Sequence, residues 1–338
     1  RLRQKERRSV LSDLASGRAG LVVGTHALVQ QKVRFRDLGL VVIDEQHRFG
    51  VLERATLRDK GRRPDVLVMT ATPIPRTLAL TSYGELDVSV IRDLPPQRRP
   101  IKTTVLSESR RNSAYRFVGK CLSEGRQAYV VYPLVAESEK SDLRAATAMF
   151  ESLRALFQNH SVGLLHGRMK SDQRDEVMKQ FTAGDVQLLV ATTVVEVGVD
   201  VPNATVMVVE HAERFGLAQL HQLRGRVGRG PDQSHCCLLH SDELTETARA
   251  RLDALAQSTD GFHIAEQDLL LRGPGEMLGT RQSGLPTLRV ADLVRDRDLM
   301  EMAVQDAQAA LQENGVPKAL LTELNEAWTR RFGLASLG

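Results

Sequence analysis

The sequence predicts an α/β protein with two parallel-sheet domains, followed by a smaller region of helices and loop. Continuous apolar runs, such as LGLVVIDE (38–45) and VQLLVATTVV (186–195), are typical of parallel strands that are buried on both faces of a sheet. Strand and helix patterns alternate in two series, which are separated by the Pro- and Arg-rich stretch RDLPPQRRPIKT (92–103). We therefore expect three domains, comprising residues 1–100, 101–240 and 241–338.

Four segments of the first series have a predicted secondary structure. A basic helix is predicted over residues 1–16, where Gly17 ends it, and GLVVGTHAL (20–28) is predicted to form a short strand and a turn. Further strands are predicted within 38–45 and 64–80, and the second of these leads through a Thr/Pro turn into a helix. Ligand-binding groups collect at the carboxyl ends of parallel strands, so the residues that follow each strand are the candidates for a site.

The second series alternates more regularly. A helix is expected to begin near Ser171, whose hydroxyl suits an N-cap, and to end at Gly184 as its C-cap. From residue 241 onward, helical segments flank the glycine-rich stretch LLLRGPGEMLGTRQSG (269–284). The expected strands of this series lie within 126–135, 162–167, 186–195 and 204–212, and the expected helices over 142–158 and 170–184.

Composition indicates a soluble globular protein. Hydrophobic residues make up 42% of the 338 positions and charged residues 26%, and no apolar run approaches the ~18 residues that span a bilayer. The net charge of +4 permits a polyanionic partner. Cys121, Cys236 and Cys237 lack metal-ligand spacing, which favours buried thiols in a reducing compartment. The sequence starts without Met in a helical pattern, so we expect a piece of a longer protein, or a processed one.

The stretch VVIDEQHRFG (41–50) places acidic residues directly after an apolar strand. Such a pair suits Mg²⁺–nucleotide chemistry, in which Asp44 holds the metal through water and Glu45 takes a proton from the water that attacks a γ-phosphate. Gln46 and His47 would then sense the phosphate or the neighbouring domain. The alternative is a polar loop without function that happens to follow a strand.

The stretch MTATPIP (69–75) carries two threonines in a tight turn at another strand end. The hydroxyls of Thr70 and Thr72 are placed to link the acidic edge to a bound polymer. The alternative is a turn whose hydroxyls only cap the following helix.

The stretch HQLRGRVGRG (221–230) is the most specific of these motifs. Arg224, Arg226 and Arg229 stand among glycines, which keep bulky side chains away and let the backbone approach closely. Such a loop can direct guanidinium groups at a γ-phosphate held elsewhere, as an arginine finger does, with Gln222 beside them. The alternative is a flexible basic loop that binds anions loosely.

Two further strand ends carry polar residues. In ATTVVEVGVDVP (191–202), the hydroxyls of Thr192 and Thr193 suit contacts with a phosphate backbone. Gly198 and Asp200 follow as nucleotide-binding candidates, and Asp200 can bridge to a ribose or to an arginine. In LLHGRM (164–169), Arg168 is a candidate phosphate contact, whereas His166 is more simply explained as structural.

These motifs, in this order, resemble those of the two RecA-like motor domains of superfamily 2 helicases. GTHAL resembles motif Ib, DEQH motif II, TATPIP motif III, LLHGRM motif IVa, ATTVVEVGVDVP motif V and QLRGRVGR motif VI. DEQHRFGV, TATPIPRTLAL and FGLAQLHQLRGRVGRG are similar to the double-stranded DNA translocases of the RecG and transcription-repair coupling factor branch, and DGFHIAEQDLLLRGPGEMLGTRQSGLP (260–286) favours the RecG family.

The resemblance implies two RecA-like domains, the first incomplete, then a helical C-terminal domain. It also implies ATP-dependent remodelling of branched DNA, namely stalled replication forks and Holliday junctions, in recombination and repair. ATP and Mg²⁺ are the implied cofactors, with Asp44, Glu45, Gln46, His47, Gln222, Arg226 and Arg229 at the catalytic site and Gly198 and Asp200 at the nucleotide. The implied DNA contacts are Thr25, Thr70, Thr72, Arg168, Thr192 and Thr193, and the implied coupling loop contains Arg272, Arg281 and Gln282.

The resemblance further implies a monomer in the bacterial cytoplasm, associated with the nucleoid and not with a membrane. Its expected partners are branched double-stranded DNA and single-stranded DNA-binding protein. Two alternatives stay open: the motor of a coupling factor that acts on stalled RNA polymerase, and a truncated motor that only binds DNA.

One family motif is missing from the sequence. A phosphate-binding loop, G-x-x-x-x-G-K-[ST], should precede the acidic pair, but Gly119-Lys120 is the only Gly-Lys pair. That pair lies in the second series, has Ala114 in place of the first glycine and is followed by Cys121. We therefore expect the 338-residue chain by itself to bind ATP weakly and to hydrolyse it negligibly.

Overall fold

The computed structural model divides the chain into two compact units, residues 1–73 and 74–338. The residues that the structure describes are 4–45, 56–57, 60–61, 64–70, 87–91, 93, 98–133, 139–192, 199–272, 295–313 and 318–332.

Unit 1 is built on a small parallel sheet. The basic helix α1 (Gln4–Ser16) ends at Gly17, whose φ of 76° is the left-handed conformation expected at a C-cap. β1 (Leu40–Ile43) and β2 (Asp65–Val68) pair in parallel with Leu40 opposite Asp65. A small core of Val41, Ile43 and Leu57 covers one face of this sheet.

Two predictions for unit 1 are wrong. Residues 20–24 form no strand, and the chain runs from them into a short 3₁₀ helix, η1 (His26–Leu28). Leu21 and Val23 are 85% and 88% exposed, because within the described part of the chain β1 pairs with β2 alone and leaves this segment no ladder to join. Within the described residues, the sheet is also covered on one face only, since Leu40, Val42 and Leu67 are exposed.

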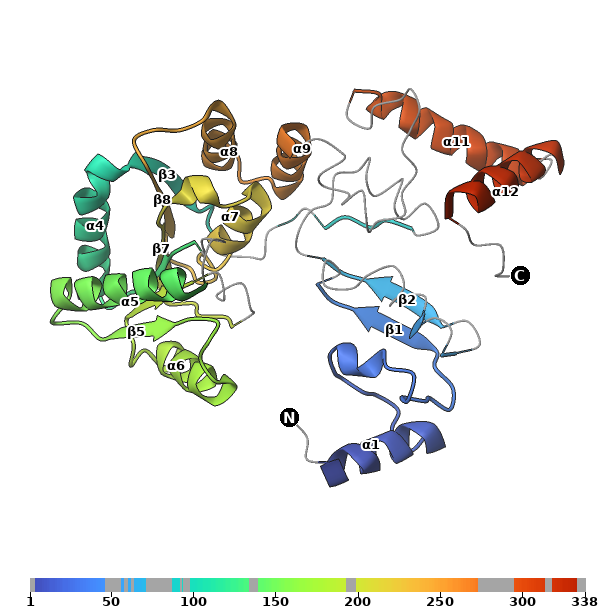
Figure 1. The fold of residues 1–338 in the computed structure, drawn as a ribbon, viewed down its shortest axis with the longest axis horizontal. Coiled ribbons are helices and arrows are strands. Elements are labelled where there is room, and N and C mark those ends of the chain that lie inside the picture. Colours follow the sequence, from blue (N-terminus) through green and yellow to red (C-terminus); the bar gives the residue numbers. More distant parts are fainter. Residues whose placement is uncertain are drawn as a thin grey trace. The chain divides into compact units, whose positions relative to one another are not determined.

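Unit 2 contains a six-stranded, all-parallel sheet (Figure 1). Its strand order is β3-β8-β7-β4-β6-β5. β4 therefore lies inside the sheet, with β6 and β5 on one side and β7, β8 and β3 on the other. β3 and β8 were not predicted from the sequence. The strands are β3 (Lys102–Ser107), β4 (Gln127–Val131), β5 (Val162–Leu165), β6 (Leu188–Ala191), β7 (Ala204–Val209) and β8 (His235–His240).

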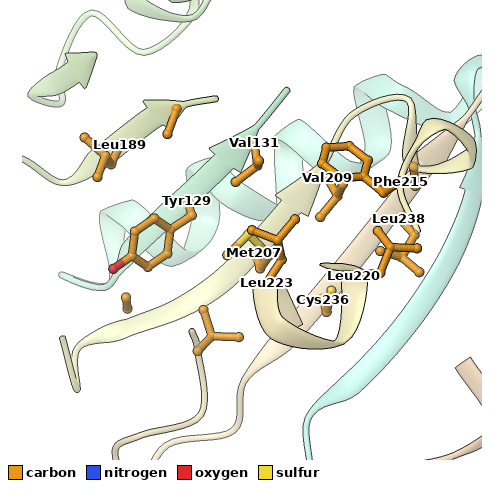
Figure 2. Packing of buried hydrophobic residues seen from close by; sticks show 14 of the residues in the cluster. Tyr129, Val131, Leu189, Met207, Val209, Phe215, Leu220, Leu223, Cys236 and Leu238 are labelled. Carbon is orange, nitrogen blue, oxygen red and sulfur yellow. The ribbon is translucent and has the colours of Figure 1, made fainter. Parts of the chain in front are cut away.

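Alternate side chains of the central strands enter two separate cores. Tyr129, Leu189 and Met207 point to one core, which also contains Phe181 and Leu220 from covering helices (Figure 2). Their strand neighbours point to the opposite core, beneath α4 (Arg111–Ser123) and α5 (Glu139–Leu156). The helices over the first core are α6 (Ser171–Ala183), α7 (Leu217–Arg224), α8 (Glu246–Gln257) and α9 (Gly261–Arg272).

The expected caps of α6 are confirmed at one end and corrected at the other. Gly184 is the C-cap with a φ of 88°. Lys170, and not Ser171, is the N-cap, and its backbone N–H donates to Gln173 Oε1 at 3.3 Å. A side chain three residues into the helix thus satisfies the N-cap amide.

The remaining described α-helices are α11 (Arg297–Glu313) and α12 (Lys318–Phe332). Within the described residues, no helix is both long and apolar enough to cross a membrane. Cys121, Cys236 and Cys237 are buried free thiols, as expected. Burial raises the pKa of Cys236 to about 12 and that of Cys237 to about 11. Both thiols are therefore protonated and unreactive at neutral pH.

Candidate functional site: an acidic strand end and an arginine loop

Asp44 and Glu45 stand at the carboxyl end of β1. Asp44 is exposed, and its Oδ1 accepts the backbone N–H of Glu45 at 2.9 Å. Glu45 has a φ of 55°, a left-handed conformation that is uncommon for a side chain other than glycine and that clusters at functional sites. The strand thus ends in a bend, where Asp44 is exposed and Glu45 is half-buried. Gln46 and His47 lie outside the described residues.

The end of β2 brings a threonine to the same edge. Ile43 of β1 lies opposite Val68 of β2, and the N–H of Met69 donates to the Ile43 carbonyl at 2.7 Å. Thr70 follows Met69 directly, and it therefore lies at the same carboxyl edge of the sheet as Asp44. Its side chain is exposed. Thr25, at the start of η1, is exposed too, whereas Thr72 lies outside the described residues.

The arginine loop, which we define as residues 225–234, joins α7 to β8. Arg229 Nη1 lies 3.7 Å from Asp200 Oδ1, and Arg229 Nε donates to the Gly225 carbonyl at 3.2 Å. Of the two roles expected for Asp200, a bridge to an arginine is therefore observed. Arg226 is half-buried in the same loop, and Gln222 is half-buried on α7 before it. Gly198 lies outside the described residues.

Arg224 differs from the two arginines after it. It is buried, and its Nη1 donates to the carbonyls of Leu255 at 2.9 Å and Ser258 at 2.7 Å. Both acceptors belong to the hairpin of α8 and α9. The expectation that Arg224 points at a phosphate is corrected, because its guanidinium is turned into the hairpin.

The other end of α7 is also held by the hairpin. Arg251 of α8 donates from Nη1 to the Phe215 carbonyl at 2.9 Å, just before α7 begins. Asp268 of α9 is buried and accepts from Arg272 Nε at 2.9 Å. Burial raises the pKa of Asp268, an effect that the Arg272 charge and the Leu217 N–H oppose. The hairpin therefore grips both ends of the helix that carries Gln222.

Arg272, the last residue of α9, pairs with Asp268 of the same helix, and its Nη2 lies close to Gly216, the N-cap of α7. Sequence reasoning placed it in a coupling loop. The two other members of that set, Arg281 and Gln282, lie outside the described residues.

The strand ends of β5 and β6 differ in access. Arg168 is exposed after β5, and burial together with the Arg168 charge lowers the pKa of His166. Thr192 is only 2% exposed at the end of β6, where its N–H donates to the Leu165 carbonyl at 3.1 Å. A direct contact of the Thr192 side chain with DNA therefore requires its surroundings to open. Thr193 lies outside the described residues.

Sequence reasoning missed a buried acid at the end of β7. Glu210 is 1% exposed, and its two carboxylate oxygens accept from Arg111 Nη2 and from the Tyr115 hydroxyl, each at 2.6 Å. Burial, followed by the Glu210 charge, raises the pKa of Tyr132 at the end of β4. This cluster fixes the start of α4 to the carboxyl edge. Its signal in the sequence is an acid directly after an apolar strand, as at Asp44.

The exposed carboxylate of Asp44 is suited to binding Mg²⁺. Within the described residues there is no group of three or more His, Cys, Asp or Glu side chains that could hold a metal ion. Mg²⁺ prefers oxygen ligands and keeps several waters, which fits a single exposed carboxylate such as Asp44. The structure thus groups Asp44, Glu45 and Thr70 at one edge in unit 1, and Asp200 with Arg229 in unit 2.

Three family profiles match successive parts of the chain. The profile of the DEAD/DEAH box helicases matches residues 1–81, and that of the helicase conserved C-terminal domain matches residues 113–231. The profile described as ATP-dependent DNA helicase RecG, domain 3, C-terminal, matches residues 258–333.

Individual relatives agree with these profiles. The chain is 53% identical over 310 residues to the ATP-dependent DNA helicase RecG of Synechocystis sp., covering 91% of this chain and 37% of the relative. It is 52% identical over 304 residues to that of Bacillus subtilis, covering 90% and 44%. A solved structure of RecG bound to a three-way DNA junction aligns with a TM-score of 0.66 and 46% identity over 89% of this chain and 38% of that one. The chain belongs to the RecG family.

The chain spans less than half the length of the RecG relatives that it matches. Within it, the predicted fold class is confirmed: RecA-like parallel α/β motor domains are followed by a helical part. The match to RecG domain 3 begins at Ser258, whose carbonyl accepts from Arg224, and it includes α9. The contact between α7 and the hairpin therefore joins the helicase motor domain to a region typical of RecG.

Proposed function

We propose that the full-length gene product is an ATP-dependent double-stranded DNA translocase and helicase that remodels branched DNA in recombination and repair. Stalled replication forks and Holliday junctions are its proposed substrates. The observation that carries this proposal is the similarity to a RecG structure bound to a three-way DNA junction, which extends through the motor domains into the C-terminal region. That region also favours RecG over the coupling factor.

In this proposal Asp44 and Glu45 divide the chemistry between them. Asp44 holds Mg²⁺ through water, and the ion supplies charge neutralisation at the phosphates when bound. Glu45 accepts the proton of the attacking water. The exposed position of Asp44 and the left-handed backbone of Glu45 support these roles. Gln46 and His47 follow as sensors of the nucleotide.

Unit 2 contributes positive charge. Arg226 and Arg229 stabilise the charge that develops on the transferred phosphoryl group, with Gln222 beside them. Asp200 holds Arg229 before it reaches a phosphate, and the spacing of 3.7 Å is long enough for the guanidinium to exchange partners. Gly198 completes the nucleotide contacts.

DNA binding is proposed for residues at the carboxyl edges of both sheets. Thr25, Thr70 and Arg168 are exposed and therefore accessible to a phosphate backbone. Thr72 and Thr193 continue the same motifs, and Thr192 joins them once its surroundings open. Arg272 couples α9 to α7, and Arg281 and Gln282 couple the following segment to DNA.

The 338-residue chain by itself is proposed to hydrolyse ATP negligibly, because its sequence contains no G-x-x-x-x-G-K-[ST] loop. The working protein is proposed to be a monomer in the bacterial cytoplasm, associated with the nucleoid. Its proposed partners are branched DNA and single-stranded DNA-binding protein.

The test is strand dissociation from a labelled three-way junction by the full-length gene product, with and without ATP. A linear duplex of equal length is the control, and a stalled transcription complex is the competing substrate. We expect ATP-dependent opening of the junction and an ATPase rate that the junction stimulates more than the duplex.

Two outcomes contradict the proposal. Displacement of RNA polymerase without opening of the junction assigns the motor to a coupling factor. Junction binding that is independent of ATP, with no ATPase activity in the full-length gene product, assigns the protein to DNA binding alone.

A further inference from the structure

The segment that enters β3 runs alongside the arginine loop. Arg98 Nε donates to the Gly228 carbonyl at 2.9 Å, although the two residues are 130 positions apart. Gln233 Nε2 donates to the Pro100 carbonyl at 2.7 Å, and the Lys102 N–H donates to the Ser234 carbonyl at 2.9 Å. Residues 98–102, which lie within the predicted linker, are thus hydrogen-bonded to the loop.

Both neighbours of Arg229 are glycines in tight contact with other segments. Gly228 has a φ of 76°, and a Cβ atom there would lie 2.8 Å from Ile101 Cγ1. A Cβ atom at Gly230 would lie 2.6 Å from the Pro202 carbonyl oxygen. Ile101 packs in turn against the core of unit 2. The backbone on either side of Arg229 is therefore in close contact with two other segments, one of which packs against the core.

The Arg98 hydrogen bond acts on the peptide group next to Arg229. The Gly228 carbonyl belongs to the same planar peptide unit as the N–H of Arg229. A donor on that carbonyl therefore fixes the plane from which the Arg229 side chain departs. Asp200 and the Gly225 carbonyl then set the direction of the guanidinium itself.

We propose that Arg98 and Ile101 are positioning residues for Arg229, so that the segment joining the two motor units sets the place of this arginine in ATP hydrolysis. This inference rests on the proposed function of Arg229. Displacement of a catalytic group by a fraction of an ångström or more lowers turnover without changing the chemistry. The contact gives movement of the linker a direct route to the arginine loop.

The first test compares Arg98→Ala, Arg98→Lys and Arg99→Ala in the full-length gene product with saturating three-way junction DNA. For Arg98→Ala we expect kcat for ATP hydrolysis to fall about 10-fold, with KM for ATP within about two-fold of wild type. Arg98→Lys retains a donor and should recover most of the loss. Arg99 is exposed beside it, and its substitution should leave kcat unchanged. A kcat within two-fold of wild type for Arg98→Ala overturns the proposal.

A second measurement does not depend on ATPase activity. In the 338-residue chain, Arg98→Ala should speed hydrogen exchange in residues 225–234 about 10-fold, while exchange in β4 and β7 stays unchanged. Unchanged exchange in the loop overturns the positioning role. If the wild-type gene product hydrolyses no ATP, the proposed function fails, and this exchange measurement alone decides whether the contact positions the loop.

Compensation gives the third test. Gly228→Ala should lower kcat because its methyl group meets Ile101. Adding Ile101→Ala should recover part of that loss by opening the space, and the left-handed φ accounts for the remainder. A double variant that is no better than Gly228→Ala alone contradicts the role of Ile101.

Discussion

The two parallel sheets differ in how much of their surface the rest of the chain covers. β1 (LVVI) and β6 (LLVA) are apolar strands of equal length, yet Val42 of β1 is 52% exposed and Val190 of β6 is fully buried. β6 lies between β4 and β5 with a core on each face, whereas β1 has one described neighbour, β2. An apolar run therefore indicates a strand only where a partner strand is available, and the neighbouring strands decide how firmly it is held.

The same difference separates the two groups of candidate catalytic residues. Arg229 stands on a loop that is fixed by Ile101 and Pro202 and adjoins a helix gripped by the hairpin. Asp44 and Glu45 stand at the end of a strand with one exposed face. The arginine group is thus positioned by extensive packing, and the acidic group by the end of β1 and the hydrogen bond between Glu45 N–H and Asp44 Oδ1.

The largest effect is expected from a substitution in the acidic group, Asp44 and Glu45. Glu45→Gln in the full-length gene product should lower the junction-stimulated ATPase rate by roughly 100- to 10,000-fold, because it removes the proposed base. Junction affinity, measured by gel mobility shift, should change less than about three-fold. Asp65→Asn, at the opposite end of β2, is the control and should have no effect on turnover. A rate within a few-fold of wild type for Glu45→Gln rejects Glu45 as the base.

The next effect sharpens the contrast between the two sheets. Leu220 belongs to α7 and is buried in the core. Leu220→Ala should lower the free energy of unfolding by about 2–5 kcal/mol. Val42→Ala, on the exposed face of β1, should lower it by less than about 1 kcal/mol. Urea denaturation of the chain followed by circular dichroism measures both. Equal losses would show that the exposed face of β1 is covered in solution.

Arg224 tests the link between α7 and the hairpin. Arg224→Met should lower the free energy of unfolding by about 2–3 kcal/mol, because the Leu255 and Ser258 carbonyls lose their charged donor. Hydrogen exchange should rise in α8 and α9 and not in β1 or β2. If exchange in the hairpin is unchanged, the hairpin is held to α7 by other contacts.

We expect His221 to make the stability of unit 2 depend on pH, with a smaller effect than the changes above. Burial, followed by the Arg224 charge, lowers its pKa to about 4, while Asp260 opposes the shift. Between pH 6.5 and 4 the unfolded chain therefore binds a proton that the folded chain excludes, so stability falls as the pH falls through this window. The loss should be about 1–2 kcal/mol by pH 5, and His221→Gln should remove it. An identical pH profile for this variant contradicts the assignment.

Sequence patterns predicted the central strands of unit 2 because their burial leaves continuous apolar runs, as in β4, β6 and β7. β3 (KTTVLS) was missed because it is an edge strand with polar residues, and its first two residues were assigned to the linker. The LVV run at 21–23 was wrongly predicted to be a strand, since an apolar run cannot reveal whether a partner strand is available.

The candidate site was predictable in its residue types and not in their contacts. Motif spacing indicated Asp44, Glu45 and the arginines of residues 224–229, but Arg224 and Arg229 are indistinguishable by residue type. The two arginines differ because of the hairpin that follows β8. Within the described residues, the hairpin carbonyls accept hydrogen bonds from Arg224 and not from Arg229. Glu210 and Arg98 were missed because their partners lie about a hundred residues away in the sequence.

The most direct test asks whether the acidic pair, Asp44 and Glu45, acts in the same ATP site as Arg229 of the arginine loop. Junction-stimulated kcat is measured for Glu45→Gln, Arg229→Ala and the double variant of the full-length gene product. If both residues act in one transition state, the double variant should lose no more than about three-fold beyond the worse single variant. Losses that multiply would show that Glu45 and Arg229 act independently, and they would contradict the shared site.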